Sequence, residues 1–178
     1  APSILGAGGH ATVEWDVALE GAARVLTGKK VFVLASPNLS NAALFLLSRL
    51  VKKSGGVGAY RVEQGAVAAL PGAPDLALRA DRAANATGAQ LLGFTRHESP
   101  LDLLQPGDAL VVADQDLSPG DAAAVSRASV VVVVGTAMPA NLPKADIILP
   151  IANVVEEEGT LTNLRGRVVP VIDLRKRC

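Results

Sequence analysis

Five consecutive valines at positions 130–134 constrain the fold of this chain more than any other feature. A run of β-branched residues without alternating polar positions is typical of a strand that is covered on both faces. Strands of this kind occur mainly in parallel sheets with helices on either side. The valines therefore predict a domain built around a buried parallel sheet.

The remainder of the chain alternates between strand and helix signals. Further strands are expected where apolar, β-rich residues cluster, at 30–35, 59–62, 90–94, 109–113, 146–149 and 168–174. Helices are expected at 15–26, with Thr12 as cap and Trp15 as a packing anchor, and also at 41–51, 75–87, 99–105 and 118–128. This order predicts a single α/β domain over residues 1–178, with a doubly wound, mainly parallel, Rossmann-like sheet and helices on both faces.

Three segments lie outside this alternation. Residues 1–11 are rich in glycine, and too few apolar residues precede the glycines for a phosphate-binding loop, so we expect a flexible leader; a sugar-nucleotide loop is the alternative. Residues 65–74 fit either a loop or a short helix. Residues 151–178 are expected to form a polar loop followed by the last strand.

Composition removes several classes of function. The 17 basic and 17 acidic residues balance, which argues against nucleic acid and anionic membranes as partners. No apolar run approaches the roughly 20 residues of a membrane-spanning helix. The only cysteine is Cys178 and there are two histidines, so we expect no cysteine-ligated metal centre in this segment.

A candidate site follows from the expected sheet, because parallel strands end at one common edge. That edge should gather Ser36, Asn38, Asp114 and Thr136, which are the candidate cofactor-binding residues. No GxGxxG or GxxxxGK[ST] motif follows a strand, so the same side chains also fit ordinary caps and turns. The acidic run at 156–158 is typical of a solvated face, and we assign no catalytic or metal-binding residue.

Two late segments carry a family resemblance. The sequences ADIILP at 145–150 and EEEGTLTNLRGR at 156–167 resemble the late domain of the molybdopterin oxidoreductase superfamily, including the G subunit of bacterial respiratory complex I (NADH:quinone oxidoreductase). Similar stretches occur at 15–19, 33–41 and 82–93. The motif residues are Glu158, Gly159, Thr160, Asn163, Gly166 and Arg167.

The resemblance implies a non-catalytic structural domain of the G subunit. Because the chain is short and lacks the cluster cysteines of longer relatives, we expect either a fragment of a larger G subunit or a reduced version of it. Such a domain has no cofactor of its own, and iron–sulfur clusters are expected elsewhere in the parent subunit. It would lie in the peripheral arm at the cytoplasmic face of the bacterial inner membrane, with other complex I subunits as partners and no direct membrane insertion. Gly159 and Gly166 would permit unusual backbone conformations, which Thr160 and Asn163 would hold.

An alternative is a fragment of a molybdopterin-guanine-dinucleotide-dependent oxidoreductase similar to formate dehydrogenase. In that case molybdopterin would be retained, and Ser36, Asn38, Asp114 and Thr136 would line its groove.

Overall fold

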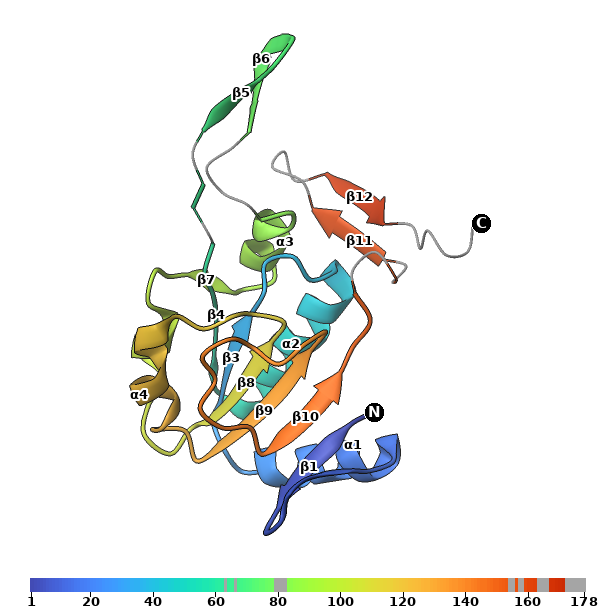
Figure 1. Cartoon of the computed structure of the whole chain (residues 1–178), viewed down its shortest axis with the longest axis vertical. Coiled ribbons are helices and arrows are strands. Elements are labelled where there is room, and N and C mark those ends of the chain that lie inside the picture. Colours follow the sequence, from blue (N-terminus) through green and yellow to red (C-terminus); the bar gives the residue numbers. More distant parts are fainter. Residues whose placement is uncertain are drawn as a thin grey trace.

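The structure, a computed structural model, describes residues 1–62, 64–65, 67–78, 83–153, 156, 159–162 and 167–171. An eight-stranded sheet of order β2-β1-β10-β9-β8-β3-β4-β7 forms its centre (Figure 1). Six of these strands run parallel, which confirms the expected α/β fold. They are β3 (Val31–Ala35), β4 (Val57–Tyr60), β7 (Thr95–Arg96), β8 (Ala109–Ala113), β9 (Val130–Gly135) and β10 (Ile147–Pro150).

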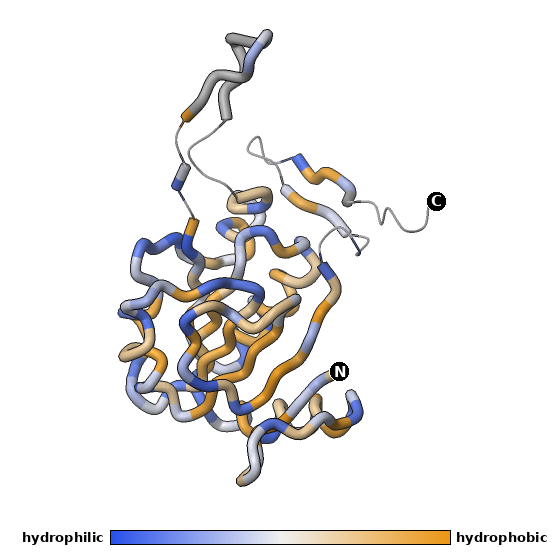
Figure 2. Tube along the Cα trace, in the orientation of Figure 1, coloured by the Kyte–Doolittle hydropathy of each residue, from blue (hydrophilic) through white to orange (hydrophobic). Residues whose placement is uncertain are grey.

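Helical segments cover both faces of the sheet. On one face lie α1 (Trp15–Leu26), α2 (Asn41–Ser54) and α3 (Ala86–Leu91), and on the other lie the 3₁₀ segment η1 (Pro100–Leu103) and α4 (Ala122–Val125), which follows η2 (Pro119–Asp121). Along β3, Val33 faces the first layer, whereas Phe32 and Leu34 face the second. Figure 2 shows the resulting concentration of hydrophobic residues along the central strands.

The sheet order places a change of direction between β3 and β8. From β3 the chain adds β4 and then β7 on one side, and it then returns to add β8, β9 and β10 on the other side. Loops leaving two strands at such a switch point diverge to opposite sides of the sheet and leave a crevice between them. The crevice here lies between the loops that follow β3 and β8.

The amino-terminal residues correct one expectation. In place of a flexible leader, β1 (Ser3–Gly6) and β2 (Gly9–Thr12) form an antiparallel hairpin, and β1 pairs with β10 in register Ser3 to Ile148. The side chain of Ile4 packs against the core, and this packing stabilises the pairing of the short segment with the sheet. The glycines lie in the hairpin and no helix follows them directly, which also excludes the sugar-nucleotide loop.

The first helices differ from expectation in the residues that they bury. Helix α1 begins after Glu14 rather than at Thr12, and it packs through small residues, with Ala18 and Ala22 buried. Trp15 is 46% exposed, so its expected role as a packing anchor is wrong. In α2, Leu44 is buried, whereas Leu46 is 63% exposed.

Residues 65–94 differ most from expectation. β5 (Ala68–Leu70) and β6 (Ala73–Leu78) form an antiparallel hairpin that projects from the body (Figure 1). The helix expected at 75–87 is wrong at 75–78, which belong to β6, because alanine-rich composition is a weak signal that pairing between strands overrides. Residues 79–82 lie outside the described residues, and 86–87 begin α3. The strand expected at 90–94 is also wrong, since α3 occupies its first residues and β7 begins only at Thr95.

The carboxyl-terminal segment contains a second small sheet. β11 (Gly159–Thr162) pairs antiparallel with β12 (Val168–Val171), so the polar loop expected to span the motif is partly a strand. Within the expected strand 168–174, residues 168–171 are confirmed and 172–174 lie outside the described residues. In the described part of the chain no helix has the length and apolar character needed to cross a membrane.

Candidate functional site

A polar groove of about 170 Å³ occupies the switch point between β3 and β8. Its described lining comes from three places: the loop after β3, the loop after β8, and the chain near the ends of β4 and the β5–β6 hairpin. The lining residues are Ser36, Pro37, Asn38, Arg61, Ala83, Asp114, Gln115 and Asp116. Three of the four expected cofactor-binding residues therefore meet at one groove.

A second hollow of about 310 Å³ continues along the same edge of the sheet. It shares Asn38 and Asp114 with the first groove, and it is bounded on the far side by the chain after β10 and by Leu161 of β11. Thr136 lines neither groove. It instead donates two hydrogen bonds to Asp114 Oδ1, from its backbone nitrogen at 3.0 Å and from Oγ1 at 2.9 Å.

The four expected site residues are each engaged within the chain. Asp114 has a left-handed backbone with φ of 50°, and its contact with Thr136 ties the end of β8 to the end of β9. Ser36 is buried, and its Oγ accepts a hydrogen bond of 3.3 Å from the Asn38 nitrogen. Asn38 Oδ1 accepts from Ala84 N at 2.8 Å. These side chains therefore order the loops around the groove.

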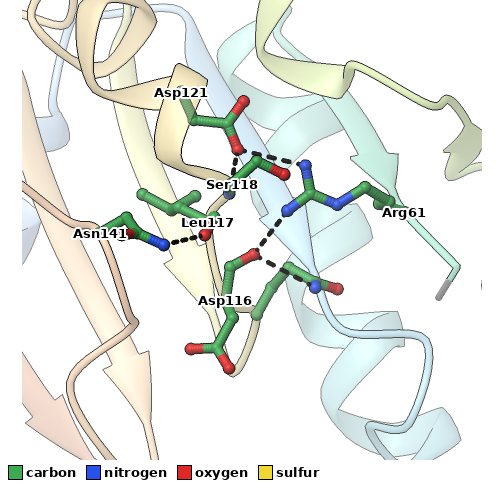
Figure 3. A network of polar contacts seen from close by, with 7 residues as sticks. Arg61, Asp116, Leu117, Ser118, Asp121 and Asn141 are labelled. Carbon is green, nitrogen blue, oxygen red and sulfur yellow. Dashed lines mark hydrogen bonds and ion pairs between the residues drawn. The ribbon is translucent and has the colours of Figure 1, made fainter.

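Arg61 is a groove residue that sequence reasoning missed (Figure 3). Its guanidinium forms an ion pair of 3.2 Å with Asp121 and donates a hydrogen bond of 2.9 Å to the Asp116 carbonyl. Asp121 also accepts from Ser118 N at 2.6 Å, as part of a capping box at η2. One arginine thus fastens the β8–η2 loop to the end of β4.

The charge of the switch-point groove disfavours a pyrophosphate. Its described lining contains two carboxylates, Asp114 and Asp116, and one cation, Arg61, whose guanidinium already pairs with Asp121. Phosphate sites in proteins instead present backbone N–H groups and cations that are available to the ligand. Among the residues that the structure describes, this groove therefore offers no available cation to the pyrophosphate of a molybdopterin guanine dinucleotide.

A buried amide network lies beside the second hollow and connects α2, α3 and β11. Asn85 is fully buried, and its Nδ2 donates to Leu39 O at 2.8 Å and to Asn41 Oδ1 at 3.0 Å. Asn85 Oδ1 accepts from Thr162 N at 2.7 Å. Asn41 then donates to Thr160 Oγ1 at 3.1 Å and accepts from Thr162 Oγ1 at 3.2 Å.

Two glycines permit this close packing. A Cβ at Gly88 would collide with the side-chain oxygens of Asn85 and Asn41. A Cβ at Gly159 would lie 3.1 Å from Ser40 Cβ, which is tighter than an ordinary contact. A side chain at residue 159 would require Ser40 to shift by a few tenths of an ångström. The unusual backbone conformation expected at Gly159 is wrong, because its φ is not positive and it lies in the regular strand β11. No spacing in the sequence predicts this network, and only the presence of asparagine and threonine at these positions is consistent with it.

The remaining residues of the family motif do not take part in this network as far as the structure describes them. Glu158, Asn163 and Gly166 lie outside the described residues, so their expected roles are untested. Arg167 is exposed just before β12. Glu156 accepts a hydrogen bond of 3.0 Å from Asn153 N, as an ordinary turn residue does.

No cluster of three or more histidine, cysteine or acidic residues suited to a metal ion occurs among the described residues. No protein-family model matches the chain.

Proposed function

We propose that this chain is a non-catalytic structural domain of the G subunit of NADH:quinone oxidoreductase, in the peripheral arm that passes electrons from NADH toward quinone. The proposal rests on how two residues of the E-x-G-T-x-T-N-x-x-G-R motif are hydrogen-bonded in the structure. Its two threonines, Thr160 and Thr162, are bonded to Asn41 and Asn85 of the same chain. In the described part of the motif, residues 159–162, these bonds tie β11 to the start of α2 and to the residue before α3.

The groove at the switch point supports the same assignment. If the domain carries no ligand, contacts within the chain must hold the loops around the groove. Here Asp114 is held by Thr136, Asn38 by Ala84, and Arg61 by Asp121. The proposed domain therefore serves as scaffold, with other complex I subunits as partners at the cytoplasmic face of the inner membrane and iron–sulfur clusters held elsewhere in the parent subunit.

One observation favours the alternative, a fragment of a molybdopterin-guanine-dinucleotide-dependent oxidoreductase similar to formate dehydrogenase. Ser36, Asn38 and Asp114 do line one groove at the switch point, where doubly wound folds bind dinucleotides. The carboxylates of that groove weigh against it, as argued above. A fold of this kind does not by itself determine activity.

The test is affinity purification of the tagged chain from its own source under native conditions. The proposal expects NADH-oxidising and quinone-reducing activity to co-purify with the tag in one iron-containing assembly. Co-purification with formate oxidation, or recovery of the chain alone from cells whose NADH:quinone activity remains in another fraction, would contradict it.

A further inference from the structure

The outer face of α2 combines exposed apolar residues with positive charge. Phe45 and Leu46 are 49% and 63% exposed, and Arg49, Lys52 and Lys53 follow in the last two turns. A shallow, largely open depression runs along this face, and the described residues that line it all belong to α2. It is lined by Leu46, Arg49, Leu50, Lys52 and Lys53.

This hollow adjoins a second one between the carboxyl-terminal ends of α1 and α2. The second hollow has a volume of about 330 Å³ and shares Leu50 and Lys53 with the first. Leu26 adds apolar surface to it, and Lys29 adds a further cation. We call the two hollows together the basic groove.

No negative charge balances these cations locally. Helix α2 contains no acidic residue, and no acidic residue lines the basic groove. Within the described part of the chain, no ion pair involves Arg49, Lys52 or Lys53. Exposed apolar patches rimmed by charge mark interaction sites, and such a rim selects a partner of opposite sign.

We propose that the basic groove docks an amphipathic helix of another protein, which carries acidic residues on either side of an apolar stripe. Leu46 and Leu50, one turn apart, would contact the apolar stripe as in other helix-in-groove complexes. Arg49, Lys52 and Lys53 would face its carboxylates.

The charges argue against other occupants. A second copy of the chain, docked symmetrically, would bring the same cations of two α2 helices together. Residues 172–178, IDLRKRC, carry three cations and one acid, so this segment has the wrong sign as well.

This inference goes beyond the proposed function and does not depend on which assembly contains the chain. The docking proposal and the proposed function can therefore be refuted independently of each other. A partner helix that belongs to a complex other than NADH:quinone oxidoreductase would refute the proposed function and leave the docking proposal intact.

The first experiment places a photo-reactive benzoylphenylalanine at Leu46 in the full chain, in cells of its own source. A matched variant carries it at Met138, which is 50% exposed and lies outside the basic groove. We expect Leu46, and not Met138, to cross-link to one segment with acidic residues flanking apolar ones at helical spacing. Cross-links to lipid, to a second copy, to a segment without acids, or none above the Met138 control would overturn the proposal.

The second experiment reverses charge with Arg49→Glu and Lys53→Glu together. Both side chains are exposed, but a negative charge in the last turn of α2 opposes the helix dipole, so the variant should lose about 1 kcal/mol in urea unfolding and remain folded. Affinity for the cross-linked partner segment, measured by titration, should fall about tenfold, and paired Glu→Lys changes in that segment should restore it. Unchanged affinity, or a loss that the partner changes fail to restore, would overturn the proposal.

Discussion

The side-chain carbonyl of Asn85 accepts a hydrogen bond of 2.7 Å from the backbone nitrogen of Thr162, which lies 77 residues further along the chain. Asn85 stands immediately before α3, and Thr162 ends β11. Because Asn85 also bonds Leu39 O and Asn41 Oδ1, one buried amide joins three separate segments of the chain. Together with the bonds that join Asn41 to Thr160 and Thr162, it ties β11 to the rest of the fold.

Replacement of Asn85 by alanine should destabilise the chain by about 3 kcal/mol, because loss of one buried hydrogen-bond partner costs roughly 1 to 3 kcal/mol and three partners are affected. Urea unfolding followed by circular dichroism measures the change. Gln90→Ala, at an exposed position of α3, is the control and should stay within about 0.5 kcal/mol of the unchanged chain. Equal stability of the two variants would show that the network does not hold the fold.

Gly88→Ala should also destabilise the chain, by about 2 kcal/mol, since overpacking of a buried site outweighs the better helix propensity of alanine. The added Cβ would displace the side chains of Asn85 and Asn41. Gly120→Ala is the matched control, because a Cβ there meets no atom within 4 Å. In the double variant with Asn85→Ala, the Gly88 effect should shrink, and full additivity would contradict the proposed clash.

Arg61→Ala should cost about 1 kcal/mol, because the ion pair with Asp121 is largely but not fully shielded from water. Arg61→Lys should recover little of this loss, since an ammonium cannot bond Asp121 and the Asp116 carbonyl with the fork of a guanidinium. Thermal unfolding measures both variants. Full recovery by lysine would mean that charge alone, without the geometry, secures the β8–η2 loop.

Substitutions at Asp114 separate a structural role from ligand binding. Asp114→Asn keeps the oxygen that accepts from Thr136 and tolerates a left-handed backbone, so stability should change by less than about 0.5 kcal/mol. Asp114→Ala loses both hydrogen bonds and should cost about 2 kcal/mol. In the native assembly, the asparagine variant should retain full NADH:quinone activity. A large loss of activity with unchanged stability would instead point to a bound ligand at Asp114.

The central strands were predictable because each is a short apolar run bounded by polar turns. The valines at 130–134 needed no knowledge of their neighbours to be assigned as β9. The start of α2 was predictable because Ser40 is a strong cap, whereas the expected end at residue 51 is three residues too early, since the helix continues to Ser54 before Gly55. The identity of the buried leucines in α2 was not predictable, because their burial depends on the strand that the helix covers.

Pairing over long distances was harder to predict. Residues 3–6 form a strand only because β10 offers an edge, and residues 73–78 form one only because β5 pairs with them. The edge that gathers Ser36, Asn38 and Asp114 followed from the parallel sheet alone. The Asn85 network did not, because its partners come from segments whose proximity no local pattern encodes.

The most direct test of the central claim is the molybdenum, tungsten and pterin content of the native assembly that contains this chain. The metals are measured by mass spectrometry and the pterin by fluorescence after oxidation, each relative to the amount of the chain. The proposed scaffold role predicts neither metal nor pterin in stoichiometric amount, together with iron and NADH oxidation. One molybdenum or tungsten with pterin per chain would contradict it and identify a working cofactor domain.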